Sequence, residues 1–189
     1  MLIMKWDIYK SNIKKALDIF EFDPQILEIL KDSVKNNQKI FVAGNGGSAC
    51  IANHLVCDFL KSANRNWETN FDRFNAISLC NNIGYITAVS NDKSYEEIFM
   101  QQLTSLASKN DILILISSSG NSANIIKAAE YGKKIGMIVI GISGFDGGKL
   151  KQISDYSAHL NYDSYGVCED VHSIFSHFLT CYLHDIKQS

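Results

Sequence analysis

The sequence has 189 residues, of which 46% are hydrophobic and 20% are charged. This length fits one domain, and this composition allows a buried core while excluding a disordered chain and a membrane protein. The formal net charge is −2, so the chain has no strong basic field. We therefore expect no binding to nucleic acid or to an anionic membrane surface.

The first twelve residues, MLIMKWDIYKSN, reach charged side chains at Lys5 and Asp7. The apolar stretch before them is too short for a signal peptide, and no apolar run elsewhere approaches the roughly 20 residues of a membrane span. We expect a cytoplasmic protein. The five cysteines form no CxxC pair, which favours reduced and mostly buried thiols over a disulfide framework or a thiolate zinc site.

The front of the chain, residues 1–36, predicts two helical segments separated by Pro24. In the first segment, apolar residues recur at offsets of three and four, as on one face of a helix. These residues are Trp6, Tyr9, Ile13, Leu17 and Phe20. The stripe can cover a flank of the domain or pack against another subunit. We favour another subunit, because helices between the predicted strands already cover the flanks.

Five short apolar runs follow, at residues 39–43, 75–79, 111–117, 137–143 and 157–162. Most are β-branched and continuous rather than alternating, which is typical of strands covered on both faces. Helix-length stretches separate them, so we expect parallel strands joined by right-handed crossovers. The predicted fold is a doubly wound, three-layer α/β sandwich with a five-stranded parallel sheet, in one domain over residues 1–189, with extra N-terminal helices.

A glycine-rich segment, Gly44-Asn45-Gly46-Gly47-Ser48, follows the first long strand and is called the glycine turn below. Its glycines allow a close approach of the backbone to a ligand, and Ser48 stands where we expect the N-cap of a helix beginning at Ala49. The segment matches neither GxGxxG nor the lysine-bearing P-loop, so it favours a simple anion or a polyol over a nucleotide. A tight turn with nothing bound is the alternative.

A serine-rich segment, residues 117–122 (SSSGNS), ends the third long strand and precedes a predicted helix; it is called the serine turn below. Its hydroxyls at a helix N-terminus supply neutral donors that suit a phosphate dianion without Arg or Lys. Plain helix capping is the alternative. Ligands of open α/β sheets bind beyond the carboxyl ends of the strands, where both turns lie.

Two further turns carry weaker signals. Asn91 and Asp92 offer amide and carboxylate groups that suit sugar hydroxyls, although such a pair is most often a cap or a turn. The glycine-rich residues 143–148 follow the fourth long strand, and we assign them mainly to chain reversal.

Histidines and carboxylates gather on two predicted helices. His54 and Asp58 are four residues apart, so they share one face of the helix after the glycine turn. On the last helix, about residues 167–186, Glu169 and His177 lie opposite the apolar stripe. The four side chains can bind a divalent metal through nitrogen and oxygen, or divide acid and base work between them. A solvated pair on a helix face is the alternative for His54 and Asp58.

Taken in order, five segments resemble the bacterial phosphoheptose isomerases, which are sugar isomerase (SIS) domain proteins. The segments are GNGGSACIANH (44–54), ND (91–92), SSSGNSAN (117–124), GFDGGKL (144–150) and EDVHSIFSH (169–177). The resemblance covers essentially the whole chain. It implies conversion of sedoheptulose 7-phosphate to D-glycero-D-manno-heptose 7-phosphate for lipopolysaccharide or capsule heptose. It also implies a homotetramer with active sites between subunits, in which residues 1–36 would be an oligomerisation segment.

The resemblance implies which residues hold the substrate. The sugar chain and its hydroxyls would be contacted by residues of the glycine turn and of the Asn-Asp turn, namely Asn45, Gly46, Gly47, Asn91 and Asp92. The phosphate would be held by five hydroxyl side chains, those of Ser48, Ser117, Ser118, Ser119 and Ser122.

The resemblance also implies a divalent metal, zinc in this family, held by His54, Asp58, Glu169 and His177. The acid/base pair of the family falls on Asp58 and His177, and Glu169 is also placed among the substrate contacts. The family usually has Glu at the position of Asp58 and Gln at that of Glu169. Aspartate is shorter by one methylene, so the helices must approach more closely or the group must act through a metal or water. Glu169 adds a negative charge, which strengthens a cation site and can raise a neighbouring pKa.

The expected reaction moves a proton between C1 and C2 of an open-chain sugar through an enediol. We assign Asp58 as the base, His177 as the acid or proton shuttle, and the metal as the electrophile for the developing oxyanion. One alternative is a non-catalytic SIS-domain protein that senses a phosphosugar or binds a partner. The presence of both His54 and His177 favours an enzyme. Another is an isomerase of a different ketose phosphate.

Overall fold

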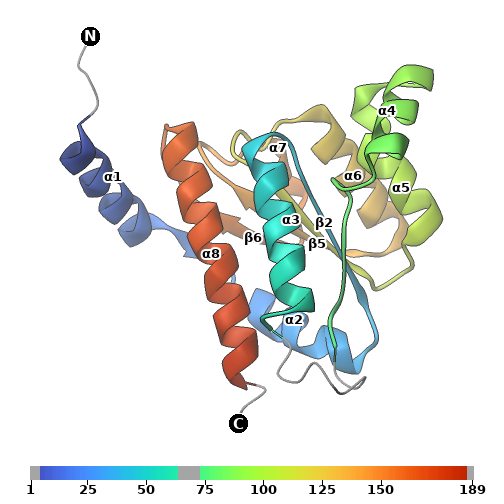
Figure 1. Ribbon diagram of the computed structural model, residues 1–189, viewed down its shortest axis with the longest axis horizontal. Helices are drawn as coiled ribbons and strands as arrows, with labels where there is room; N and C mark the ends of the chain where they lie inside the picture. The colour runs from blue at the N-terminus through green and yellow to red at the C-terminus, as the bar shows by residue number, and fades with distance from the viewer. Residues whose placement is uncertain (1–4, 64–72, 187–189) are drawn as a thin grey trace.

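The computed structural model describes residues 5–63 and 73–186 (Figure 1). The strands are β1 (Glu21–Phe22), β2 (Lys39–Gly44), β3 (Asn75–Ser78), β4 (Ile112–Ser117), β5 (Ile138–Ser143) and β6 (Tyr156–His159). The helices are α1 (Trp6–Ile19), α2 (Gln25–Lys35), α3 (Gly47–Leu60), α4 (Ile83–Asp92), the 3-10 helix η1 (Tyr95–Glu97), α5 (Ile98–Leu106), α6 (Ala123–Ile135), α7 (Gly148–Ile153) and α8 (Tyr165–Ile186).

The described residues form one sheet in the order β1-β6-β5-β4-β2-β3. All five predicted strands are present, and they pair with one another in parallel. A sixth strand was not predicted: β1 pairs with β6 in the antiparallel direction, through Glu21↔His159 and Phe22↔Ala158. Two residues are too few to show a hydrophobic period, so only their position beside β6 makes them a strand.

Both faces of the sheet are covered by helices, which gives the predicted three layers. Along β4, Ile112, Ile114 and Ile116 belong to the core beneath α2, α3 and α8. The alternate residues Leu113 and Leu115 belong to the core beneath α5, α6 and α7. Side chains of a strand alternate between its faces, so a continuous apolar run results when both faces are buried. Figure 1 shows α3 and α8 side by side over one face of the sheet.

Helix α1 lies at the edge of the molecule, beside α8 (Figure 1). Part of its predicted stripe covers the flank of the same chain, because Tyr9 and Ile13 pack with the residues of α8. The hydroxyl of Tyr9 also donates a hydrogen bond to Asp170 of α8 (2.8 Å). Trp6 and Leu17 remain 70% and 41% exposed. The stripe therefore leaves apolar surface uncovered. Residues 1–4 of the predicted oligomerisation segment lie outside the described residues.

None of the described helices combines the length and the hydropathy that crossing a bilayer requires.

Candidate functional site

The glycine turn connects β2 to α3 at the carboxyl edge of the sheet. Gly46 has φ +53°, a left-handed conformation that favours glycine, and it is the N-cap of α3. The helix therefore begins at Gly47 and not at Ala49, and Ser48 lies in the first turn and not at the predicted N-cap. A Cβ atom on Gly47 would lie 2.5 Å from Oε1 of Glu169. Only glycine allows the carboxylate of α8 to approach the first turn of α3 so closely.

The serine turn connects β4 to α6, the helix predicted to follow it, which begins at Ala123. Gly120 has φ +64°, and a Cβ atom there would lie 2.0 Å from the carbonyl oxygen of Gly147. Two backbone hydrogen bonds join the serine turn to the residues after β5: the N–H of Gly144 donates to Ser118, and that of Leu150 donates to Gly120 (both 2.9 Å). The turn at residues 143–148, assigned mainly to chain reversal, thus also supports the serine turn.

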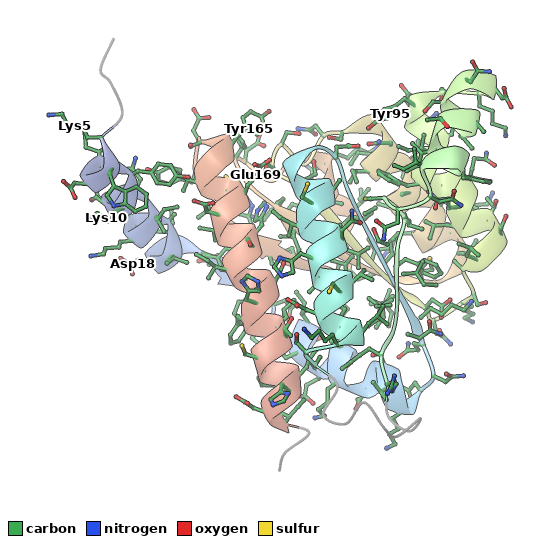
Figure 2. All side chains as sticks on the ribbon, viewed as in Figure 1. Lys5, Lys10, Asp18, Tyr95, Tyr165 and Glu169 are labelled. Atoms are coloured by element: carbon green, nitrogen blue, oxygen red, sulfur yellow. The ribbon has the colours of Figure 1, made fainter. Side chains whose placement is uncertain are left out.

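The two turns and the first turns of α8 enclose a cavity of about 160 Å³. Its lining consists of Asn45, Ser48, Ile116, Ser117, Ser118, Ser119, Ser122, Tyr165 and Glu169. All five serines assigned to the phosphate therefore face one space, and no Lys or Arg of the part of the chain that the structure describes lines it. Figure 2 shows Tyr165 and Glu169 at the end of α8 that lies beside the start of α3.

Ser118 has an unusual side chain. Its hydroxyl is buried and makes no hydrogen bond to any of the described residues. Buried polar atoms nearly always have a partner, because leaving one unsatisfied costs about 1–3 kcal/mol. Since Ser118 lines the cavity, a bound ligand with an acceptor oxygen would supply the missing partner.

Asn91 and Asp92 form the last turn of α4 and not a separate turn between helices. The side-chain amide of Asn91 donates to Oδ1 of Asp92 (2.9 Å). Neither residue belongs to the lining of the cavity. Their assignment to sugar hydroxyls stays a prediction.

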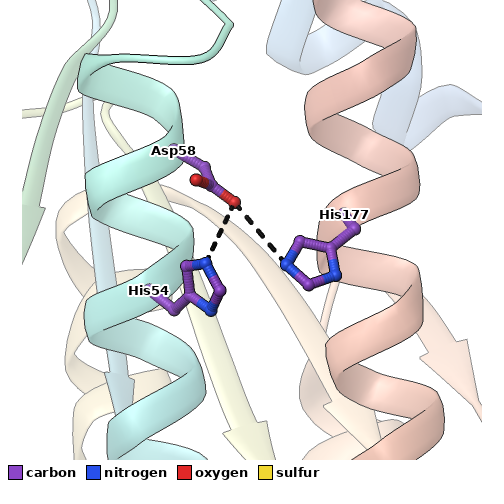
Figure 3. A group of neighbouring side chains, drawn as sticks. All are labelled: His54, Asp58 and His177. Carbon is purple, nitrogen blue, oxygen red and sulfur yellow. Dashed lines mark ion pairs between the residues drawn. The ribbon is translucent and has the colours of Figure 1, made fainter.

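The structure brings His54, Asp58 and His177 together across the interface between α3 and α8 (Figure 3). Oδ2 of Asp58 lies 3.6 Å from Nε2 of His54 and 3.9 Å from Nε2 of His177. The two imidazole rings are nearly perpendicular, with centroids 4.9 Å apart. The carboxylate is 14% exposed, whereas both imidazoles are about half exposed. The group is therefore open to small molecules on its histidine side.

These three side chains fit a divalent metal ion. Their ligand atoms, two nitrogens and one oxygen, all lie within 4.8 Å of one another. Two donors that share a metal at 2.0–2.2 Å are separated by at most about 4.3 Å. Small side-chain rotations would therefore bring all three ligand atoms within binding distance of one ion. Nitrogen and oxygen donors of this kind suit zinc and other first-row metals.

Glu169 was predicted to complete this group, but it is not among the side chains whose ligand atoms lie within 4.8 Å of one another. It precedes His177 by eight residues, which is about 12 Å along the axis of α8. The structure places its carboxylate in the lining of the serine-rich cavity, next to Gly47. The site thus has two parts along the α3–α8 interface: the cavity at the sheet edge and the histidine–aspartate group farther along the helices.

Sequence reasoning missed three residues of this region. Tyr165 lines the cavity. Asn124 and Tyr95 form hydrogen bonds with the side chain of Asn45. Asn124 lies just after the serine turn and Tyr95 shortly after the Asn-Asp pair, but nothing in their spacing indicated that either would meet the glycine turn.

Comparisons with known proteins agree on a family. The family model of the SIS domain matches residues 24–144. The chain is 36% identical over 172 residues to the phosphoheptose isomerase of Helicobacter pylori (strain P12), covering 90% of this chain and 88% of that protein. It is 32% identical over 185 residues to the phosphoheptose isomerase of Aneurinibacillus thermoaerophilus, covering 92% of this chain and 90% of that protein.

Solved structures give the same result. The structure of phosphoheptose isomerase from Francisella tularensis superposes with a TM-score of 0.83 and 26% identity, covering 97% of this chain and 100% of that one. The structure from Neisseria gonorrhoeae superposes with a TM-score of 0.79 and 26% identity, covering 94% and 91%. The resemblance found in the sequence is therefore confirmed, and the chain belongs to the phosphoheptose isomerase family of SIS-domain proteins.

Proposed function

We propose that this protein is an aldose–ketose isomerase that converts sedoheptulose 7-phosphate to D-glycero-D-manno-heptose 7-phosphate. Family membership supports this reaction. The observation that carries the proposal is the Asp58 carboxylate beside two imidazoles, at the same α3–α8 interface that encloses the serine-lined cavity. A protein that only senses a phosphosugar needs the cavity, but it has no need of an acid/base group.

The cavity suits the phosphate of the substrate. Its five serine hydroxyls can donate hydrogen bonds, and the N-terminal turns of α3 and α6 add the positive ends of two helix dipoles. The unsatisfied hydroxyl of Ser118 gains a partner when an anion binds. Phosphate held here, remote from the reacting carbons, supplies binding energy that positions C1 and C2.

Glu169 suits a different part of the substrate. Its carboxylate lines the cavity and would repel a phosphate dianion at short range. A carboxylate accepts hydrogen bonds well, so we assign Glu169 to sugar hydroxyls next to the phosphate. With Glu169 about two helical turns from His177, we assign the metal to His54, Asp58 and His177.

Asp58 and His177 carry out the two proton transfers of the isomerisation. Asp58 removes a proton from C1 of the open-chain ketose, which leaves an enediol, and returns a proton to C2. His177 moves the hydroxyl proton from O1 to O2, so that the ketone becomes an alcohol and C1 becomes the aldehyde. A divalent metal, zinc in our proposal, supplies when bound an electrophile for the oxyanion that develops at these oxygens. Neutral His177 and ionised Asp58 are the forms that can accept protons.

We further propose a homotetramer with active sites between subunits. The exposed apolar residues of α1 support this assembly. An adjacent apolar cavity of about 250 Å³ is lined by Leu17, Phe20, Phe22, Val171, Ile174, Phe175 and Phe178. Residues 1–36 would be the oligomerisation segment. We place the reaction in the cytoplasm and assign the product to heptose for lipopolysaccharide or capsule.

The test is an NMR assay of the purified protein with sedoheptulose 7-phosphate, before and after treatment with a chelator and after zinc is restored. We expect the heptose product, and in D2O we expect deuterium at C2, because the transferred proton exchanges with solvent on the carboxylate. Binding without turnover, with and without zinc, would instead identify a phosphosugar sensor. Turnover of another ketose phosphate in preference to this one would correct the substrate.

A further inference from the structure

The side chain of Asn45 is held in a hydrogen-bond network that joins three segments of the chain. Its Nδ2 donates to Oδ1 of Asn124 (2.8 Å), and Nδ2 of Asn124 donates back to Oδ1 of Asn45 (2.9 Å). The hydroxyl of Tyr95 donates to the same Oδ1 of Asn45 (3.0 Å). The glycine turn, the start of α6 and η1 are thereby linked through one amide.

The orientation of both amides follows from one backbone group. The N–H of Ile125 can only donate, and it donates to Oδ1 of Asn124 (2.9 Å). This assigns the oxygen of Asn124, and the reciprocal pair then assigns the oxygen of Asn45. An amide oxygen accepts about two hydrogen bonds. Oδ1 of Asn45 therefore has no capacity left once both Asn124 and Tyr95 donate to it.

This network determines which hydrogen-bonding group of the Asn45 side chain is available to a ligand in the cavity. Asn45 lines the cavity, and one hydrogen of its Nδ2 is not used in the network of described residues. A ligand in the cavity thus meets a hydrogen-bond donor and no acceptor at this position. A phosphate oxygen accepts such a bond, whereas a sugar hydroxyl that seeks an acceptor finds none there.

Tyr95 itself stands outside the cavity. Its side chain is 56% exposed, and Figure 2 shows it at the α4 side of the molecule, away from Tyr165 and Glu169. The short helix η1 is fastened to α6 by the ion pair between Glu96 and Lys127 (2.9 Å). Lys127 lies one turn after Asn124, so η1 and Asn45 are anchored to the same part of α6.

We infer that Tyr95 is a positioning residue of the phosphosugar site: by occupying the oxygen of Asn45, its hydroxyl makes that amide a pure donor toward the phosphate group. Tyr95 acts only through Asn45 and touches no substrate. This inference rests on the proposed function, since it takes the ligand of the cavity to be a phosphate ester.

A double-mutant cycle tests the inference, with Tyr95→Phe, Asn45→Ala and the double variant. The primary measurement is calorimetric binding of inorganic phosphate. Tyr95→Phe should weaken phosphate binding about fivefold, the typical effect of one hydrogen bond, and should raise KM for the phosphosugar more than it lowers kcat. In the Asn45→Ala background, Tyr95→Phe should have no further effect on binding. Tyr85→Phe is the matched control, because it removes a tyrosine hydroxyl that donates to Gln101 (3.3 Å) outside the cavity.

The outcomes separate this inference from the proposed function. If the wild-type protein binds phosphate but does not isomerise the sugar, the proposed reaction is wrong, while the cycle still reports on Tyr95. Equal effects of Tyr95→Phe in both backgrounds would show that Tyr95 does not act through Asn45. Unchanged phosphate binding in Tyr95→Phe, or no phosphate binding by the wild-type protein, would also overturn the inference.

Discussion

Oδ2 of Asp58 lies 3.9 Å from Nε2 of His177, across the interface between α3 and α8. The two residues are 119 positions apart in the sequence, and each is held by a helix whose other face is buried in the same core. A carboxylate that is mostly buried and an imidazole that is half exposed therefore face each other where a small sugar can reach both.

Asp58→Asn should lower kcat by roughly 10²–10⁴-fold, because it removes the base while preserving the shape of the side chain. Phosphosugar binding, measured by calorimetry, should stay within a few-fold of wild type. Asp58→Glu restores a carboxylate on a chain longer by one methylene and should recover a substantial part of the activity. If Asp58→Asn retained wild-type turnover, Asp58 would not be the base.

His54→Ala and His177→Ala should each weaken zinc binding by more than about tenfold, because each removes one of three donors. The measurement is competition for zinc against a chelator of known affinity, supported by the absorption spectrum of the cobalt(II) protein. His184→Ala is the control, since His184 lies on α8 outside the group and contacts the carbonyl of Ser62. Equal zinc affinity in all three variants would exclude this metal site.

Ser118→Ala should weaken phosphate binding and yet leave the ligand-free protein as stable as wild type, or more stable by up to about 1 kcal/mol. The reason is that the variant removes a buried hydroxyl that has no partner among the described residues. Ser33→Ala is the contrasting control, because the buried hydroxyl of Ser33 donates to the carbonyl oxygen of Leu30. Loss of that hydrogen bond should lower the free energy of unfolding. Urea unfolding gives both free energies of unfolding. A clear loss of stability in Ser118→Ala would mean that its hydroxyl is satisfied internally.

His172 should make the protein less stable as the pH falls. Burial lowers the pKa of His172 to about 4 from its ordinary value of 6.5. Between these two pH values the imidazole is protonated in the unfolded chain but not in the folded protein. The free energy of unfolding therefore falls by about 1.4 kcal/mol for each unit by which the pH is lowered. Burial also lowers the pKa of His159, which adds a dependence of the same sign.

The measurement for His172 is the urea midpoint at several pH values between 4 and 7.5. His172→Asn should show a weaker dependence on pH than wild type, whatever its stability at neutral pH. His184→Asn, on the same helix, leaves His172 in place and should keep the wild-type slope. Identical slopes in wild type and His172→Asn would contradict the burial of a neutral imidazole.

Leu17→Asp should shift the protein to a smaller assembly, because a charge on the exposed apolar face of α1 is costly to bury between subunits. Light scattering after size-exclusion chromatography measures the mass. Lys15→Asp places the same charge on the opposite side of the helix and should leave the mass unchanged. A wild-type protein that is monomeric at all concentrations would remove the basis of the proposed tetramer.

Several features could be read directly from the sequence because each is local to one element. Continuous apolar runs predicted the five parallel strands, since burial on both faces of a strand leaves no polar position. The spacing of four residues placed His54 and Asp58 on one helix face, since it is close to one helical turn. The hydroxyl side chains of the serine turn predicted a ligand site there from composition alone, and the turn lines the cavity.

Relations between elements were decided only by the tertiary structure. Periodicity says which face of a helix is apolar, but not how far two helices are displaced along each other. That displacement brings His177 to Asp58 and leaves Glu169 beside Gly47, away from the group it was expected to join. The edge strand β1 and the hydrogen bond from Tyr95 to Asn45 likewise depend on partners distant in the chain, which no local pattern of residues can encode.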